Sequence, residues 1–158
     1  MLLAVLTVSD RCSQGRMEDK SGPVLVDMLR RQYAEAEIET AVLPDEEAAI
    51  AAQLNQWCDR GAALILTTGG TGFGPRDVTP EATRRVIDRE APGLVEAMRS
   101  SGAGTNAFAW LSRAVAGLRG STIIVNLPGS ENGARDSFNA ILTILEHAVE
   151  VAAGADHI

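Results

Sequence analysis

One stretch decides the fold of this chain: Thr67-Thr68-Gly69-Gly70-Thr71-Gly72-Phe73-Gly74-Pro75-Arg76-Asp77-Val78-Thr79-Pro80-Glu81. The apolar run directly before it, residues 62–66, has the composition of a buried strand. The last three residues of the quoted stretch suit the start of a helix, with Thr79 as the cap, Pro80 in the first helical position and Glu81 near the positive end of the helix dipole. Four glycines between strand and helix let the backbone approach a ligand closely. This order of elements is typical of anion binding by open α/β sheets.

The glycine loop does not follow either of the commoner phosphate-binding patterns. A Walker loop needs a Lys near its end, and the only Lys in this chain is Lys20. A dinucleotide fingerprint needs a third Gly where this chain has Pro75 or Asp77, depending on the register. Glycines after a strand also form simple tight turns, which is the structural alternative. The added Thr, Arg and Asp favour a ligand-binding loop.

Length and charge limit the possible classes of protein. A chain of 158 residues predicts a single domain over residues 1–158 with one sizeable core. The net charge of −7 argues against nucleic acid or a membrane surface as a general partner, because both select a basic patch. A local positive pocket remains compatible with this charge, and Arg11, Arg76 and Arg113 are candidates for it.

The cysteines and histidines predict no zinc site, because neither Cys12 and Cys58 nor His147 and His157 have ligand spacing. No run reaches transmembrane length. The apolar start, Met1 to Val8, is too short for an export signal and is expected to form the first core strand. We therefore expect a cytoplasmic protein with reduced thiols.

Apolar runs alternate with amphipathic segments along the first two thirds of the chain, which predicts βαβ units. Together they indicate an α/β fold: one three-layer domain with a mostly parallel, doubly wound sheet. The predicted strands are Leu2–Val8, Ile38–Leu43 and Leu64–Thr68, and the predicted helices run from Ser21 to about Tyr33, from Pro44 onward, over Pro80–Asp88 and from Pro92 to about Ser100.

The C-terminal third predicts a hairpin followed by a long helix. Ala114–Leu118 and Ser121–Leu127 flank Arg119-Gly120, so one strand is expected to run antiparallel. The last helix is predicted from about Asn132 to Ala153. His147 lies off its apolar stripe, which favours an exposed helix histidine over a catalytic one.

Several motifs, in order along nearly the whole chain, make this sequence resemble the molybdopterin adenylyltransferases. This family comprises the bacterial MogA proteins and the G domains of gephyrin-like proteins, and the MoaB proteins and a competence-damage domain share its fold. The motifs are Ser9-Asp10, Leu43-Pro44-Asp45-Glu46, Thr67-Thr68-Gly69-Gly70-Thr71-Gly72, Pro75-Arg76-Asp77-Val78-Thr79-Pro80-Glu81-Ala82, Arg89-Glu90-Ala91-Pro92-Gly93, Leu111-Ser112-Arg113 and Asn126-Leu127-Pro128-Gly129.

The resemblance implies a MogA-like fold, a homotrimer and a role in molybdenum cofactor biosynthesis. It implies Mg²⁺ as cofactor, ATP as co-substrate, and transfer of AMP to the terminal phosphate of molybdopterin with release of pyrophosphate. Molybdenum insertion would belong to a separate E-domain type protein. The apolar segment Phe108–Leu111 is a weak candidate for the subunit interface or the local core.

The resemblance makes Asp45 and Asp77 the expected catalytic carboxylates and Mg²⁺ ligands, since carboxylates hold the ion that lowers repulsion between two phosphates. The structural alternative for Asp77 is an Asx turn before the Thr79 cap. Asp45 instead caps the second helix, and both roles are compatible.

The remaining expected ligand-binding residues follow strand ends at the same edge of the sheet. Three of these residues also have a structural alternative. Asp10 could cap a loop, Ser130 could cap the final helix, and Arg76 could be a solvated surface charge. The set is Ser9, Asp10, Gly69, Gly70, Thr71, Gly72, Arg76, Pro128, Gly129 and Ser130.

Two other functions fit the same fold. One is a non-catalytic module that binds molybdopterin or scaffolds a partner, and the other is a nucleotide hydrolase. The presence of both Asp45 and Asp77 favours the enzyme, because a carrier needs no metal-binding carboxylates.

Overall fold

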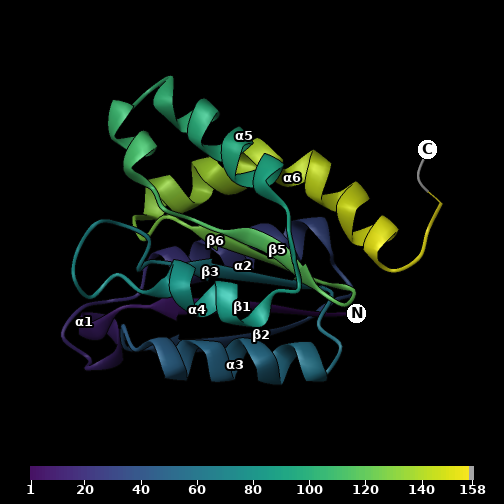
Figure 1. Ribbon diagram of the computed structural model, residues 1–158, viewed down its shortest axis with the longest axis horizontal. Helices are drawn as coiled ribbons and strands as arrows, with labels where there is room; N and C mark the ends of the chain where they lie inside the picture. Colours follow the sequence, from purple (N-terminus) through teal and green to yellow (C-terminus); the bar gives the residue numbers. More distant parts are fainter. Residues whose placement is uncertain (157–158) are drawn as a thin grey trace.

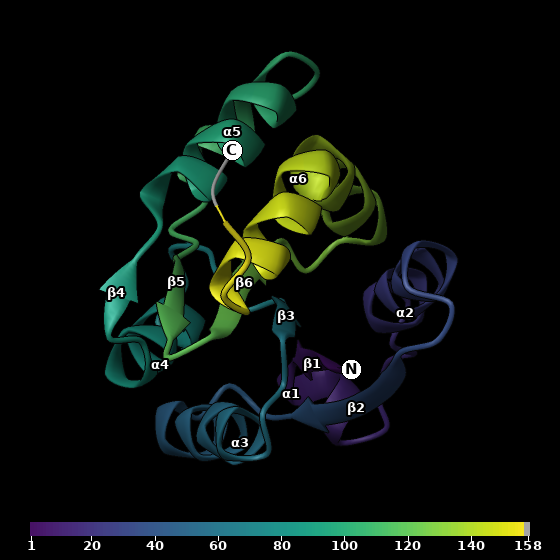
Figure 2. The same cartoon turned by 90° about the vertical axis from the view of Figure 1, so that its right-hand side faces the viewer.

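The computed structural model describes residues 1–156, so His157 lies outside the described residues. Six strands form one sheet in the order β2-β1-β3-β6-β5-β4, and helices cover both of its faces (Figures 1 and 2). The strands are β1 Leu2–Val8, β2 Glu37–Leu43, β3 Leu64–Thr68, β4 Arg89–Glu90, β5 Ala116–Arg119 and β6 Thr122–Leu127. The helices are α1 Asp10–Ser13, α2 Ser21–Gln32, α3 Glu47–Asp59, α4 Thr79–Val86, α5 Pro92–Ala103, η1 Ala107–Leu111 and α6 Glu131–Ala152.

The sheet is mostly parallel, as predicted. β1 pairs in parallel with β2 and β3, and β3 pairs in parallel with β6. β5 runs antiparallel to both β6 and β4, so within this sheet it is the reversed strand. The predicted hairpin connects β5 to β6 through Gly120. Its φ of +56° lies in the left-handed region, which favours glycine because glycine has no Cβ.

The three layers are held together by an apolar core on each face of the sheet. Side chains alternate along β1, so Leu3 and Val5 face one core while Ala4 and Leu6 face the other. The helices α2, α5 and α6 cover the first core, and α3 and α4 cover the second (Figure 2). The central strands β1, β3 and β6 are therefore buried on both sides, which explains their mainly apolar sequences.

Several local features differ from the sequence prediction. The helix expected from Pro44 begins at Glu47, the one expected to end at Asp88 ends at Val86, and the one expected to end near Ser100 continues to Ala103. The polar loop after β1 contains the short helix α1, capped by Ser9, whose Oγ accepts a hydrogen bond from the Cys12 N–H at 3.1 Å. The two-residue strand β4 was not predicted. The apolar segment after α5 forms the 3-10 helix η1. The helix α6 begins at Glu131, one residue earlier than predicted, and carries His147 exposed on its surface.

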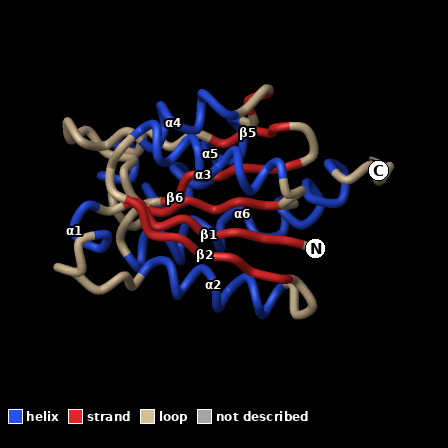
Figure 3. Tube along the Cα trace, turned by 90° about the horizontal axis from the view of Figure 1, so that it is seen from below, coloured by secondary structure: helices blue, strands red, loops and turns tan. Residues whose placement is uncertain are grey.

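The loops that follow β1, β2, β3 and β6 meet at one edge of the sheet, because parallel strands end on the same side (Figure 3). This edge holds every site residue that the sequence predicted. In the described part of the chain, no helix is long and apolar enough to cross a membrane.

Candidate active site

The glycine loop after β3 has a backbone that only glycine adopts easily. Gly69 and Gly70 have φ values of +98° and +69°. A Cβ on Gly69 would lie 2.2 Å from the Val8 carbonyl oxygen, and one on Gly70 would lie 2.3 Å from Thr79 Oγ1. The loop is therefore folded tightly against β1 and α4, and the two glycines are needed for this packing.

Thr79 fixes this loop and does not cap α4, contrary to the sequence prediction. The N-cap residue of α4 is Val78, which has no capping side chain. The Thr79 hydroxyl donates instead to the Gly69 carbonyl at 2.9 Å, and its N–H donates to the Gly70 carbonyl at 3.1 Å. The hydroxyl satisfies a buried carbonyl of the glycine loop, so Thr79 stabilises the packing of the loop against α4 and not the helix end.

Removing that hydroxyl is expected to destabilise the protein. Thr79→Val keeps the side-chain shape but leaves the buried Gly69 carbonyl without this donor, at a cost of about 1–3 kcal/mol. Thermal unfolding should show a clear fall in Tm for this variant. Thr105→Val is the control, because it removes an exposed hydrogen bond to Gly102 and should leave the Tm nearly unchanged. Equal Tm values for the two variants would contradict this role of Thr79.

The loop after β6 packs directly against the glycine loop. The Thr68 hydroxyl donates to the Pro128 carbonyl at 2.6 Å, and the Gly69 N–H donates to the Leu127 carbonyl at 3.1 Å. A Cβ on Gly129 would lie only 3.1 Å from Gly69 Cα. The predicted strand-end loops therefore form one continuous surface.

Free backbone donors gather on this surface. Within residues 1–156, the N–H groups of Gly70, Thr71 and Gly72 donate to no acceptor, whereas the Gly69 N–H is used inside the protein. The N-terminus of α6 lies alongside, where Ser130 Oγ accepts from the Gly133 N–H at 3.0 Å, so the capping role of Ser130 is confirmed. Unpaired N–H groups beside a helix N-terminus favour an anionic ligand.

Asp45 and Asp10 lock the loops after β2 and β1 together. The Asp10 N–H donates to Asp45 Oδ2 at 2.9 Å, and the Asp45 N–H donates to Asp10 Oδ1 at 3.0 Å. Asp45 does not cap α3, because the N-cap residue is Glu46 and no side chain bonds there. Burial raises the pKa of the Asp45 carboxyl, and the negative charges of Asp10 and Asp77 raise it further. A site that crowds carboxylates in this way favours a cation.

The Asp77 carboxylate lies over the glycine loop. Its Oδ2 accepts a hydrogen bond from the Gly74 N–H at 2.8 Å. A Cβ on Gly72 or Gly74 would lie 2.8 Å or 2.9 Å from the same oxygen. The glycines thus leave the space that the carboxylate occupies, and Asp77 bonds backward into the loop instead of forward into α4.

Arg76 is paired with Asp10 across the mouth of the site. Its Nε and Nη2 donate to the two Asp10 oxygens at 3.0 Å and 2.9 Å. These hydrogen bonds, followed by that of the Asp45 N–H, hold the pKa of Asp10 below its usual value. Arg76 is therefore not simply solvated, and its charge is already shared with a carboxylate.

Replacing Arg76 should raise the pKa of Asp10. Because the folded-state pKa is lowered, the stability from this pair is present above the unfolded value near 3.8 and is lost as the pH falls through the folded value. An NMR titration of the Asp10 carboxyl in Arg76→Gln should show protonation at higher pH than in the wild type. Arg60→Gln, which breaks a comparable pair with Glu39 elsewhere, should leave Asp10 unchanged. An Asp10 titration indifferent to Arg76 would refute the pairing.

Two clefts meet at the glycine loop, with volumes of about 640 Å³ and 910 Å³. The smaller extends toward α5, η1 and the start of α6, and the larger toward α1 and the loop before α2. Every predicted site residue except Arg76 lines one of them. The residues shared by both clefts are Gly70, Asp77, Gly129 and Ser130.

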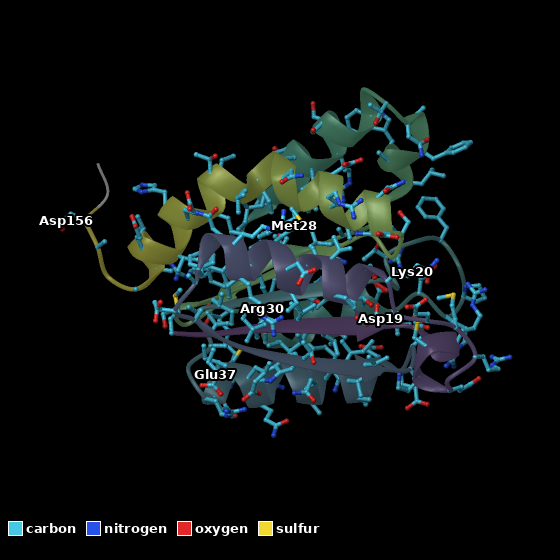
Figure 4. The ribbon with its side chains drawn as sticks, turned by 180° about the vertical axis from the view of Figure 1, so that it is seen from behind. Asp19, Lys20, Met28, Arg30, Glu37 and Asp156 are labelled. Atoms are coloured by element: carbon cyan, nitrogen blue, oxygen red, sulfur yellow. The ribbon has the colours of Figure 1, made fainter. Side chains whose placement is uncertain are left out.

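The sequence did not predict that three cations gather at the rim of the larger cleft. Arg11, Arg16 and Lys20 line this cleft and are exposed, although its lining also holds the carboxylates of Asp10, Glu18, Asp19, Asp45, Asp77 and Glu131. Figure 4 shows Lys20 and Asp19 at the end of the molecule where α1 lies. Of these three, the sequence offered only Arg11 for a positive pocket, because no local pattern brings Arg16 and Lys20 to the strand ends.

Arg113, a candidate for a local positive pocket, is engaged in hydrogen bonds within the protein. Its guanidinium pairs with the Glu81 carboxylate at 2.9 Å and 3.1 Å and donates to two carbonyls of the glycine loop region. The hydrogen bonds from Arg113 lower the pKa of Glu81. Arg113 thus belongs to the support of the site.

The fold and the site define an open α/β domain with a candidate site at the carboxyl ends of its parallel strands, the place where domains of this class bind anionic ligands. Residues 4–147 match the family described as "Probable molybdopterin binding domain", and this chain belongs to that family.

Similar proteins support the assignment. The molybdopterin adenylyltransferase of Escherichia coli is 39% identical over 88% of this chain and 72% of that protein. The molybdenum cofactor synthesis protein cinnamon of Drosophila melanogaster is 43% identical over 93% of this chain, which spans 25% of that longer protein. The solved structure of MogA aligns with a TM-score of 0.92 and 35% identity, covering 96% of this chain and 99% of that one.

Proposed function

We propose that this protein adenylylates molybdopterin with ATP. An oxygen of the terminal phosphate of molybdopterin attacks the α-phosphorus of ATP, the bond to the β-phosphate breaks, and pyrophosphate leaves. The observation that carries this proposal is the meeting of two clefts at Asp77 and the unpaired glycine-loop amides. Two substrates that react phosphate to phosphate need two cavities with one shared, anion-stabilising boundary.

The residues of the chain have distinct tasks in this proposal. The N–H groups of Gly70, Thr71 and Gly72 stabilise negative charge on the phosphates, since they have no acceptor within residues 1–156. Pro128, Gly129 and Ser130 form the opposite wall, and Ser9, Asp10 and Gly69 line the larger cleft. The rim cations Arg11, Arg16 and Lys20 offset the charge of a polyphosphate, which suits an otherwise acidic chain.

Asp45 and Asp77 are the residues that would hold Mg²⁺. Within the described chain, Oδ1 of each accepts no hydrogen bond, so each carboxylate keeps an oxygen for a ligand. No group of three or more acidic, His or Cys side chains gathers in a metal-binding arrangement among residues 1–156. Two carboxylates suit Mg²⁺ that takes its other ligands from phosphates and water. The ion would neutralise charge on the reacting phosphates.

The assembly and location of the protein are part of the same proposal. We expect a cytoplasmic enzyme that acts before a separate E-domain type protein inserts molybdenum. The longer relative cinnamon carries sequence beyond the part matched by this chain, which supports a functional association with further domains. Nucleic acid and membranes are not expected partners, given the net charge of −7.

A homotrimer is the expected oligomeric state. The segment around η1 exposes Phe108 and Trp110 with 76% and 60% of their surface accessible, and Leu111 with 49%. Adjacent exposed apolar side chains favour burial in an interface. Light scattering should give a mass near three chains over a wide concentration range. A monomer mass that does not change with concentration would reject the trimer.

Incubation with Mg-ATP and molybdopterin tests the function. Formation of adenylylated molybdopterin and pyrophosphate in equal amounts is the expected result. Tight binding of molybdopterin without a product would indicate the non-catalytic module instead. ATP hydrolysis that is indifferent to molybdopterin would indicate a hydrolase. Each of the two latter results overturns the proposal.

A further inference from the structure

A single guanidinium group joins both ends of the segment that carries Asp77. Arg113 Nε donates to the Gly72 carbonyl at 2.8 Å, and its Nη2 donates to the Asp77 carbonyl at 2.7 Å. The Arg113 N–H donates in addition to the Thr71 carbonyl at 2.9 Å. Arg113 lies just before β5 and lines neither of the two clefts that meet at the loop. Arg113 therefore binds the loop on the side that does not face the clefts.

Glu81 fixes the guanidinium in turn. Its two carboxylate oxygens accept from Arg113 Nη1 at 2.9 Å and Nη2 at 3.1 Å. Glu81 belongs to the first turn of α4, which anchors this contact to the helix that follows the loop. Four hydrogen bonds leave the Arg113 fork little capacity to bind a substrate, and Glu81 neutralises its charge. The pair is a fixed support.

The geometry of the clamped segment determines where the Asp77 carboxylate lies. The carboxylate accepts from the Gly74 N–H within that segment, and the Asp77 N–H donates back to the Gly74 carbonyl at 3.0 Å. The carboxylate lies against Gly72, where an added Cβ would be only 2.8 Å from Asp77 Oδ2, so its place depends on the backbone of this segment. A change in the spacing between the carbonyls of Gly72 and Asp77 would move the carboxylate relative to both clefts.

We propose that Arg113, held by Glu81, is a positioning residue that sets the place of the Asp77 carboxylate and of the glycine-loop amides. This inference rests on the proposed adenylyl transfer. A lysine cannot replace it, because an ammonium group is a point charge and does not present a planar fork to two carbonyls and a carboxylate. Since a misplacement of about 1 Å can cost roughly a hundredfold in rate, Arg113→Lys should lower kcat at least about tenfold. KM for each substrate should change little, because Arg113 touches neither cleft.

Arg119→Lys is the matched control for this test. The side chains of Arg113 and Arg119 are 35% and 34% exposed, and each pairs with a carboxylate at 2.9 Å. Arg119 joins β5 to α3 and lines neither cleft. The expected result is a similar Tm for both variants, with kcat reduced only in Arg113→Lys. Retention of kcat in Arg113→Lys within about twofold of the control would overturn the proposal.

Hydrogen exchange tests the clamp independently of turnover. The amides of Gly74 and Asp77 are hydrogen-bonded inside the clamped segment. Their exchange should accelerate at least about tenfold in Arg113→Lys and stay unchanged in Arg119→Lys. If the wild-type protein transfers no adenylyl group, the proposed function fails. Hydrogen exchange alone then shows whether Arg113 holds the segment in place. Equal exchange of both amides in the two variants would then overturn it.

Discussion

Asp77→Asn is expected to lower the rate of adenylyl transfer by roughly a hundredfold or more, which corresponds to about 2.7 kcal/mol of activation free energy. The carboxylate lies between the two clefts and keeps Oδ1 free of hydrogen bonds within the described chain. Asparagine retains an oxygen that can accept from the Gly74 N–H, so the loop geometry should persist. The loss would therefore come from the charge, and the Tm should remain close to that of the wild type.

Asp88→Asn is the matched control for this prediction. Asp88 also lies in a loop and accepts one backbone hydrogen bond, from the Gly120 N–H at 2.9 Å, but it is exposed where Asp77 is half-buried. It lines neither cleft at the strand ends. Asp88→Asn should keep the wild-type rate. A near-normal rate in Asp77→Asn at an unchanged Tm would remove Asp77 from the catalytic machinery.

Asp45→Asn should also lose much of the rate with little change in stability. Asparagine at this position can still accept from the Asp10 N–H, which makes the structural contact tolerant of the change. The negative charge, which burial and the neighbouring Asp10 and Asp77 make costly, is the property that a cation would need. Because Asp45 does not cap α3, the alternative explanation through helix capping has no support in the structure.

The double variant Asp45→Asn/Asp77→Asn tests whether the two carboxylates act together on one metal–phosphate region or independently. If both carboxylates act on one metal–phosphate region, losing either already disables it, so the double variant should be hardly slower than Asp77→Asn. Single-turnover rates of the wild type, both single variants and the double variant give the coupling directly. An unimpaired Asp45→Asn protein would leave Asp77 as the only supported catalytic carboxylate. Multiplicative losses would show that the two residues act independently.

Much of the fold follows from the sequence because its central strands are buried on both faces. β1, β3 and β6 are mainly apolar runs ended by polar or glycine loops, and such runs have few alternative structures. β4 gave no signal, since its two residues are both exposed. The short helix α1 depends on one cap, Ser9, and on the Asp10–Asp45 contact, which a local pattern does not contain.

The candidate site was predictable as a set of strand ends but not as a network. Parallel topology alone brings the loops after β1, β2, β3 and β6 to one edge of the sheet. The contacts within it join residues distant in sequence, as Arg113 joins Gly72 across 41 positions. Thr79 shows the same limit, because a threonine before a proline satisfies a helix-capping pattern locally while its hydroxyl bonds a distant carbonyl.

The most direct test of the central claim uses ATP radiolabelled at its α-phosphate in a single turnover with excess protein and molybdopterin. The label is expected to move into a phosphate-linked molybdopterin product in one phase. This phase should be slowed roughly a hundredfold in Asp77→Asn and unchanged in Asp88→Asn. Label that remained in ATP, or that appeared only as free AMP, would contradict adenylyl transfer. Equal rates for Asp77→Asn and the wild type would contradict the site.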